Sequence, residues 1–385
     1  MAKIMVVFPG NERGGAATHL LAYAKSVVHA RLEGLIQFIS LGDGPLLDDL
    51  QAVLAQVEIV SGSTGGRIKT LAVKMKQQGR DVLWHAHGPR ANFVVFMASR
   101  RSRRHFTSTV HSNPLQDFLG SRAKSLLFTR LNLFCLRRTV GVFVGNREFA
   151  EYLPSRQAYF VPNAIEPVTG AASRSDARLR LCEDLDIPQE STVIGIVARL
   201  DPVKDLRTVI MALPLVAKRL ARPVHLVIAG PGAQLQELQR IAIENSVEAF
   251  VHFLGFVKET EPLYLAMDAH VLPSKSEGES PFVILEAGNY GVPNLGSDIP
   301  GIRNLIVDGQ TGWLFPVGDA QALAERLELV LRNPEEAMKC VDAFRQTVLP
   351  RFSPAAMLEA YLSGYEAMGF AALQSESEME PSLQT

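Results

Sequence analysis

The chain alternates short apolar runs with longer segments in which apolar positions recur at helical spacing. In the first half the runs are KIMVVF, LIQFISL, VLWHAH, FTSTVH, VGVFVG and QAYFVPN. In the second half they are TVIGIVARL, VHLVIAG, FVHFLGF, AHVLPS, VPNLGS and WLF. Helical patterns such as residues 18–30 and 124–138 lie between the runs. Strands that alternate with helices form βαβ units. The pattern therefore predicts an α/β fold of two doubly wound, Rossmann-like domains, each built on a parallel sheet.

The stretch EPVTGAASRS, rich in small and polar residues, is the expected linker between the two domains. It predicts one domain at residues 1–170 and a second at residues 171–352. The polar, acidic residues 371–385 predict a disordered tail. Because open parallel sheets bind ligands beyond the carboxyl ends of their strands, we expect the functional residues at those ends.

Composition narrows the class of protein. The 385 residues are 47% hydrophobic and 21% charged, which is typical of a soluble globular protein. No uncharged apolar run is long enough to span a membrane, and MAKIMVVFPG lacks the pattern of a signal peptide. The three cysteines are far apart and form no C-x-x-C pair, so we expect reduced thiols in a cytoplasmic protein.

Charge is distributed unevenly along the chain. Residues 1–170 hold 21 Lys and Arg against 11 Asp and Glu, a net charge of +10, and the remainder holds 18 against 29, a net charge of −11. A basic first half favours an anionic partner, which could be nucleic acid, an acidic membrane surface or a phosphorylated acceptor. The segment RAKSLLFTRLNLFCLRR reads as a cationic amphipathic helix suited to an anionic membrane. A core helix with a solvated basic face is the slightly favoured alternative.

The first domain offers two kinds of candidate. After the first strand, Gly14 and Gly15 permit a tight turn into a helix whose amino end would suit a phosphate, although a plain glycine turn explains them equally well. His19, one turn into that helix, is expected to be a packing residue. His85 and His87 end a strand on one side of it, but no further metal ligands are evident nearby. His111 ends another strand and is either a turn residue or a site residue.

The second domain carries the sharper pattern. Arg199 follows a strand and Lys204 precedes a helix, so the two cations could hold a diphosphate. Salt bridges to Asp201 or Asp205 are the alternative. Gly230 marks a further turn between a strand and a helix. The D-x-D at residues 184–186 precedes a strand, and we interpret it as surface charge.

The stretch SKSEGESPFVILEAGNYG combines a loop with the start of an apolar helix. Ser280 is the expected N-cap, Pro281 the first helical residue, and Gly291 the end of the helix. Glu286 would then lie within that apolar helix and need a partner, for which ribose hydroxyls or a salt bridge would serve. Glu277 and Glu279 lie in the preceding loop, where the helix dipole accounts for one carboxylate more readily than for both.

In this order, the pieces resemble the retaining glycosyltransferases of family 4, which have the two-domain GT-B fold. The resemblance runs from GGAATH through TVH, VPNAIE, ARLDPVK, IAGPG and VHFLGF to VLPSKSEG and LEAGNYGVPNLGSDIPGIRNLIVDGQTGWLFPVGD. The segment FSPAAMLEAYLSGYEAM resembles the family's terminal helix, which crosses back to the first domain. Residues 353–370 would form that helix.

The resemblance implies a UDP- or GDP-sugar donor, retention of the anomeric configuration, and no metal or other cofactor. The acceptor would be a glycan, a lipid-linked molecule or a small molecule, and a membrane location would be peripheral. Gly15 would lie against the donor phosphates and His111 would contact the donor sugar or its phosphate. Arg199 and Lys204 would neutralise the leaving diphosphate, and Glu286 would bind the ribose. The remaining donor-binding residues implied by the resemblance are Gly14, Gly230, Phe256, Val257, Ser280, Pro281 and Phe282.

One feature departs from the family pattern, in which seven residues usually separate the two glutamates. That spacing from Glu286 falls on Gly278, whereas Glu277 is one residue too far and Glu279 one residue too near. Pro281 keeps its expected distance, so we favour an extra residue before it and Glu277 as the family glutamate, with Glu279 a close second.

Three other functions stay open on the sequence. A non-catalytic nucleotide-sugar-binding protein could have kept this fold, and the shifted glutamate favours that interpretation. A sugar-nucleotide epimerase or a phosphorylase could use a similar scaffold. The basic half could instead bind a membrane or nucleic acid, although we expect no nucleic-acid partner.

Overall fold

The computed structural model describes residues 3–111, 122–153, 157–168, 173–278 and 280–370. The chain divides into two compact units. Unit 1 contains the residues up to Glu166 together with those from Ser353 onward, and unit 2 contains Pro167–Phe352. The stretch taken as a linker is in part helical, because α6 (Arg174–Asp184) begins within it and Ser173 caps that helix.

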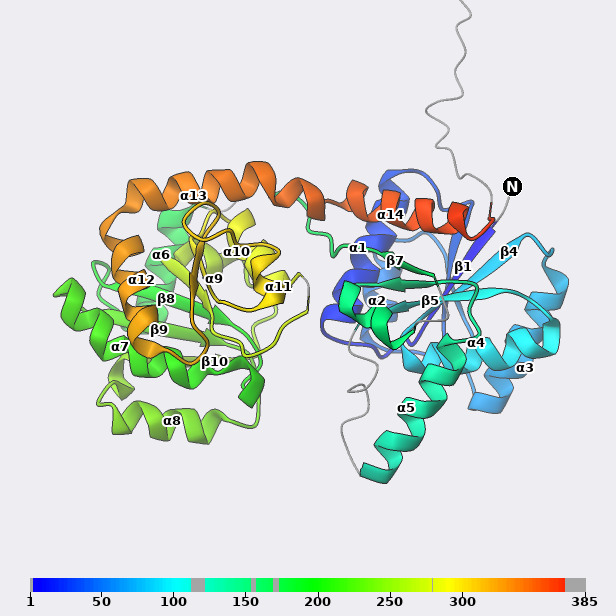
Figure 1. Ribbon diagram of the computed structural model, residues 1–385, viewed down its shortest axis with the longest axis horizontal. Coiled ribbons are helices and arrows are strands. Elements are labelled where there is room, and N and C mark those ends of the chain that lie inside the picture. The colour runs from blue at the N-terminus through cyan, green and yellow to red at the C-terminus, as the bar shows by residue number, and fades with distance from the viewer. Residues whose placement is uncertain (1–2, 112–121, 154–156, 169–172, 279, 371–385) are drawn as a thin grey trace, which may run out of the picture. The chain divides into compact units, whose positions relative to one another are not determined.

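Unit 1 is built on a seven-stranded parallel sheet in the order β3-β2-β1-β4-β5-β6-β7 (Figure 1). Its strands are β1 (Lys3–Phe8), β2 (Ile36–Ser40), β3 (Val57–Ile59), β4 (Val82–His87), β5 (Phe106–Val110), β6 (Val142–Val144) and β7 (Ala158–Phe160). The sequence pattern missed β3 because this edge strand is only three residues long and two of them are exposed. The other six strands lie where the apolar runs predict them.

Helices cover both faces of the unit 1 sheet, as Figure 1 shows. They are α1 (Gly15–His29), α2 (Pro45–Gln51), α3 (Thr64–Gln77), α4 (Pro89–Ser102), α5 (Arg122–Leu136) and α14 (Pro354–Ala367). Along β1, Ile4, Val6 and Phe8 pack with residues of α1 and α14. Met5 and Val7 point to the other face and pack with residues of α3 and α4. Because both faces are buried, the strand is continuously apolar.

Unit 2 is built on a six-stranded parallel sheet in the order β10-β9-β8-β11-β12-β13. Its strands are β8 (Thr192–Val197), β9 (Val224–Ala229), β10 (Val251–Gly255), β11 (Ala269–Leu272), β12 (Asn294–Ser297) and β13 (Trp313–Phe315). Its further helices are α7 (Leu206–Leu220), α8 (Leu235–Glu244), α9 (Glu261–Ala266), α10 (Phe282–Asn289), α11 (Pro300–Arg303), α12 (Ala320–Arg332) and α13 (Pro334–Thr347). Ile194 and Ile196 pack on one face of this sheet and Val193 on the other. Both sheets confirm the predicted class of two doubly wound domains.

The helix α14 packs within unit 1, although the chain reaches it only after the whole of unit 2. Figure 1 shows it, in red, beside α1. Its Gly364 is required by packing, because a Cβ atom there would lie 2.2 Å from the ring of Phe143. Tyr361 and Tyr365 on the same helix are fully buried.

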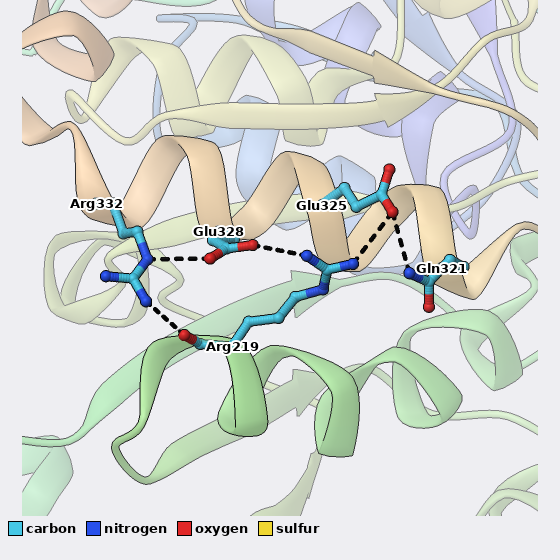
Figure 2. Close-up of polar contacts among 5 residues, drawn as sticks. All are labelled: Arg219, Gln321, Glu325, Glu328 and Arg332. Carbon is cyan, nitrogen blue, oxygen red and sulfur yellow. Dashed lines mark hydrogen bonds and ion pairs between the residues drawn. The ribbon is translucent and has the colours of Figure 1, made fainter.

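An ion-pair network on the surface of unit 2 joins α7 to α12 (Figure 2). Arg219 at the end of α7 donates to Glu328 at 2.8 Å and to Glu325 at 3.1 Å. Gln321 donates to Glu325 at 3.0 Å. Arg332 donates to Glu328 at 3.0 Å and to the backbone carbonyl of Arg219 at 2.5 Å. Exposed ion pairs of this kind stabilise a fold only slightly, so we expect the network to contribute little to the stability of unit 2.

Candidate active site

The carboxyl end of β8 in unit 2 carries the first cation of the predicted site. The guanidinium of Arg199 is 73% exposed, and its Nη2 lies 2.9 Å from the Asp201 carboxylate. Asp201 also accepts a hydrogen bond from the backbone N–H of Val203 at 3.2 Å, which caps the 3-10 turn Pro202–Lys204. The salt bridge considered as an alternative is therefore present at Arg199. It is monodentate and exposed, so it leaves most of the guanidinium donors accessible.

Lys204 has a different partner. Its side chain is only 17% exposed, and its Nζ donates to Oε1 of Glu277, whose side chain is 10% exposed. Ser274 donates to the same carboxylate oxygen at 2.5 Å. Asp205 instead pairs with Lys275 at 3.2 Å and accepts from Thr208 at 2.7 Å. A charge-assisted contact between residues 73 positions apart thus fixes the lysine beside the loop that follows β11.

The contact with Lys204 is relevant to the question of whether Glu277 or Glu279 corresponds to the first glutamate of the family pattern. Glu277 is held next to Lys204, while Glu279 lies outside the described residues. The loop backbone at Glu277 and Gly278 packs tightly on α11. A Cβ atom at Gly301 would lie 2.2 Å from the carbonyl oxygen of Gly278 and 2.9 Å from that of Glu277. Glycine at position 301 therefore permits this close approach.

The second glutamate lies on α10. Oε2 of Glu286 accepts a hydrogen bond from the hydroxyl of Tyr264 at 2.8 Å. Tyr264 is fully buried on α9 and stacks on Tyr290, with 5.7 Å between the ring centroids. Burial raises the pKa of Glu286, and the tyrosine hydrogen bond opposes that shift. The sequence pattern missed Tyr264, although a tyrosine within the apolar run EPLYLAM signals a hydroxyl that needs a partner.

The start of α10 differs from the prediction by one residue. The helix begins at Phe282, and Pro281 occupies the N-cap position in an extended conformation, with φ −61° and ψ 122°. Ser280 precedes the cap and is buried. The assignment of Ser280 as the N-cap is therefore wrong, because the extended proline delays the first helical residue. Gly291 follows the helix with φ +78°, which confirms it as the end of the helix.

The remaining predicted donor residues lie at two other strand ends of unit 2. Gly230 follows β9 with φ +144°, and a Cβ atom there would lie 1.9 Å from the carbonyl oxygen of Ala198. The close packing of the loops after β8 and β9 therefore requires glycine at position 230, whether or not this glycine contacts a donor. Phe256 follows β10 and is 77% exposed, which is unusual for a large aromatic side chain. Val257 packs against the apolar cluster beneath it.

In unit 1, four histidines meet at the carboxyl end of the sheet. This histidine cluster consists of His19 on α1, His85 and His87 on β4, and His111 after β5. His87 Nδ1 lies 3.2 Å from His111 Nε2, and the rings of His19 and His111 are 4.8 Å apart. The sequence places His19, the pair His85 and His87, and His111 in three separate motifs, and the fold of unit 1 brings them together.

Uncharged side chains hydrogen-bond the histidine cluster. His19 contacts Asn163 at 2.9 Å and the Tyr361 hydroxyl at 2.8 Å, which confirms it as a packing residue. His85 contacts the Tyr365 hydroxyl at 2.6 Å and Thr109 at 2.7 Å. These contacts tie α1, β4 and β5 to α14.

Electrostatics keep the histidine cluster neutral. Burial lowers the pKa of His19 to about 4. Burial, with the nearby histidines, also holds the pKa values of His85, His87 and His111 well below the ordinary range. No carboxylate hydrogen-bonds these rings within the described part of the chain. A neutral His111 can donate to or accept from a ligand, but it does not supply a positive charge.

The glycine turn before α1 has two different glycines. Gly14 has φ +71°, a conformation that favours glycine. Gly15 has neither a positive φ nor any atom within 4 Å of the position that a Cβ would occupy. The fold of unit 1 therefore does not demand glycine at position 15. Among the described residues, no group of three or more His, Cys, Asp or Glu side chains is arranged to hold a metal ion. The D-x-D residues Asp184 and Asp186 are exposed.

The chain is similar in sequence to known glycosyltransferases. Residues 179–347 match the family model "Glycosyl transferases group 1". The putative glycosyltransferase EpsD of Bacillus subtilis is 26% identical over 293 residues, covering 74% of this chain and 76% of that protein. A GDP-mannose-dependent α-(1-6)-phosphatidylinositol monomannoside mannosyltransferase of Mycolicibacterium smegmatis is 25% identical, covering 84% and 87% of the two chains.

Solved structures show the same fold. HepE of Anabaena, crystallised with UDP and glucose, superposes with a TM-score of 0.77 at 20% identity, covering 95% of this chain and 100% of that one. Taken together, the matches show that the chain is similar to glycosyltransferases with the GT-B fold. Within the described residues, no helix is long and apolar enough to cross a membrane.

Proposed function

We propose that the protein is a retaining glycosyltransferase that moves a sugar from a UDP- or GDP-sugar to a hydroxyl of a glycan, lipid-linked or small-molecule acceptor. The contact of Lys204 with Glu277, beside the exposed Arg199, is the observation that carries this proposal. Two cations at the carboxyl edge of a parallel sheet suit a diphosphate. The names of relatives support the same donor class, since one uses GDP-mannose and HepE was crystallised with UDP-glucose.

Each residue has a distinct part in this proposal. Lys204 and Arg199 stabilise the charge that develops on the leaving diphosphate, and they do so without a metal. Glu277 fixes the position of Lys204, and Glu286 accepts hydrogen bonds from the ribose hydroxyls. Phe256 offers an exposed aromatic face to the nucleotide. Ser280, Pro281 and Phe282 shape the loop that contacts the sugar.

For unit 1, the family resemblance predicts donor contacts by Gly15 and His111. The open space around Gly15 supports close approach of a ligand, because the fold itself does not require glycine there. The partners of His111 support a neutral hydrogen-bonding role rather than a metal-binding one.

A donor screen tests the proposal. Release of UDP or GDP from candidate sugar nucleotides is measured with and without acceptors, and in the presence of EDTA. We expect acceptor-dependent release that EDTA does not abolish. Release of free nucleotide without any acceptor would favour an epimerase, and binding without turnover would favour a non-catalytic protein. NMR of the product gives the anomeric configuration, and an inverted product would contradict retention.

The two loop glutamates are tested in the same assay. Glu277→Gln should lower turnover by about tenfold or more, because it weakens the charge-assisted contact to Lys204. Glu279→Gln should have a smaller effect. The reverse order of effects would assign the family role to Glu279.

We also propose that α5 docks peripherally on an anionic membrane. Large apolar side chains are exposed along this helix at Leu127, Phe128 and Phe134. Arg138 lies over the Phe134 ring at 4.1 Å, so cationic and apolar groups share one region. Sedimentation with anionic vesicles should be lost at high salt or on reversal of the charges of Arg137 and Arg138. Binding that does not depend on lipid charge would contradict docking.

A further inference from the structure

A pocket of about 500 Å³ lies at the carboxyl edge of the unit 1 sheet. It opens beyond β1, β2 and β4, in the region where parallel sheets bind ligands. Its volume is in the range of pockets that hold small organic molecules. The pocket is lined by Pro9, Asn11, Leu41, Thr64, Arg67, Pro89, Arg90, Phe93, Val94, Phe128, Leu131 and Asn132.

Most of this lining is apolar. Phe93 and Val94 come from α4, Phe128 and Leu131 from α5, and Leu41 follows β2. Phe128 is also 44% exposed, so the apolar wall continues to the surface of the unit. An apolar pocket that opens beside an exposed aromatic ring suits an apolar chain more than a sugar.

The charged part of the lining is cationic. Arg67 and Arg90 both line the pocket, and its described lining contains no carboxylate. The Nε atom of Arg67 is buried and has no hydrogen-bond partner among the described residues. The Nη1 atom of Arg90 donates to the side-chain carbonyl of Asn11 at 3.2 Å. Two guanidinium groups of this kind, one with a buried donor unused, suit a phosphate.

A smaller pocket of about 60 Å³ adjoins the first one and shares Pro89 and Asn132 with it. Glu12 and His111 line this smaller pocket. Burial raises the pKa of Glu12, and nearby Arg90 opposes the shift. The cavity is therefore apolar and cationic at one end and polar, with hydroxyl-binding groups, at the other.

From this arrangement we infer that the larger pocket binds the apolar chain and phosphate of an amphiphilic acceptor, that is, an isoprenyl or alkyl phosphate linked to the group that carries the acceptor hydroxyl. Phe93, Phe128 and Leu131 would contact the chain, and Arg67 and Arg90 would bind the phosphate. The inference rests on the proposed glycosyltransferase function for the role of the ligand as acceptor, but the binding itself does not depend on turnover.

Calorimetric titration of the whole protein with farnesyl phosphate, farnesol and inorganic phosphate tests the inference. Farnesyl phosphate should bind at least about tenfold more tightly than either fragment. Equal binding of farnesol would overturn the role of the arginines, and equal binding of inorganic phosphate would overturn the role of the apolar wall. Farnesyl phosphate that fails to bind at all would overturn the whole inference.

Variants locate the binding in this pocket. Arg90→Gln and Arg67→Gln should each weaken the binding of farnesyl phosphate by about tenfold and leave the binding of farnesol unchanged. Phe128→Ser should weaken the binding of both farnesyl phosphate and farnesol. Arg101→Gln is the matched control, because this exposed arginine lies at the other end of α4 and outside the pocket. Melting curves confirm that each variant is folded, and normal binding in all three pocket variants would contradict the assignment.

The two proposals fail in different ways. UDP and GDP binding, measured on the same samples, reports on the nucleotide-sugar site and should be unchanged in the pocket variants. If no nucleotide binds and farnesyl phosphate still does, the glycosyltransferase proposal fails and the pocket remains. If nucleotides bind and farnesyl phosphate does not, only the pocket inference fails.

Discussion

The carboxyl edges of the two sheets differ in the charge of the polar side chains that gather there. In unit 1 the histidine cluster is neutral, and its rings hydrogen-bond tyrosine and threonine side chains. In unit 2 the corresponding edge carries Arg199 and Lys204 with carboxylates that leave them partly accessible. Burying a charge is costly unless it is paired, so a neutral cluster favours stability. An accessible charge at a sheet edge favours an anionic ligand.

This contrast predicts that substitutions at the unit 2 edge affect turnover, whereas substitutions in the histidine cluster affect stability. It also separates His111 from its neighbours. His111 follows its strand, is half-buried and lines the smaller pocket, so it is placed to contact both the cluster and a ligand.

The largest expected effect is that of Lys204→Ala on turnover. Loss of a fixed cation beside a developing diphosphate charge should lower kcat/KM by roughly 10²–10³-fold. The matched control is Lys218→Ala, an exposed lysine near the end of α7. Steady-state nucleotide release measures both variants. Normal turnover by Lys204→Ala would show that the diphosphate role is wrong.

The next effect concerns acid stability. Because the folded pKa of His19 is about 4, below its value of about 6.5 in the unfolded chain, folding favours the neutral ring. Its contribution to stability is complete above pH 6.5 and is lost as the pH falls toward 4. Between pH 7 and pH 5 this loss should be about 2 kcal/mol.

Urea unfolding at pH 7 and pH 5 measures this loss. His19→Gln should be less sensitive to pH than the wild-type protein by about that amount. His29→Gln, an exposed histidine on the same helix, should behave as the wild type. Equal pH sensitivity of all three proteins would contradict a buried neutral His19.

A smaller effect is expected from Tyr264→Phe, which removes the hydrogen bond to Glu286. Donor KM should rise by about tenfold with a smaller change in kcat, since the tyrosine positions the ribose-binding carboxylate. The hydroxyl lowers the pKa of Glu286, so its removal should raise that pKa further. As the pH is lowered, Glu286 should therefore become protonated, and donor affinity should fall, at a higher pH in the variant than in the wild type. An unchanged pH profile would indicate that Tyr264 only packs.

The smallest effect is that of Arg219→Ala in the network of Figure 2. The ion pairs are exposed, so the melting temperature of unit 2 should fall by no more than about 3 °C. The difference should shrink at high salt. Differential scanning calorimetry measures it, and a large drop would mean that the surface network holds the unit together.

Much of the fold follows from local sequence pattern. Apolar runs located every strand except β3, which is only three residues long and mostly exposed. Charged residues beside apolar runs marked Arg199 and Lys204 after β8, and Glu286 within α10, as candidate site residues. Local pattern failed at Ser280, where an extended Pro281 moved the start of the helix by one residue.

Contacts distant in sequence could not be predicted. The partner of Lys204 is Glu277, and the partner of Glu286 is Tyr264, and neither pair follows from the residues alone. The histidine cluster combines β4, β5 and α1 with α14 from the far end of the chain. Such contacts depend on the order of strands in the sheet and on chain crossovers, which local periodicity does not specify.

The central claim is that the carboxyl edge of unit 2 binds the diphosphate of a nucleotide sugar through Lys204. Calorimetric titration of the wild-type protein and Lys204→Ala with UDP, uridine, GDP and guanosine tests it most directly. For one of the two bases, the wild type should bind the diphosphate at least about 100-fold more tightly than the nucleoside, and Lys204→Ala should lose about tenfold or more of that preference. The same preference in both proteins would contradict the claim.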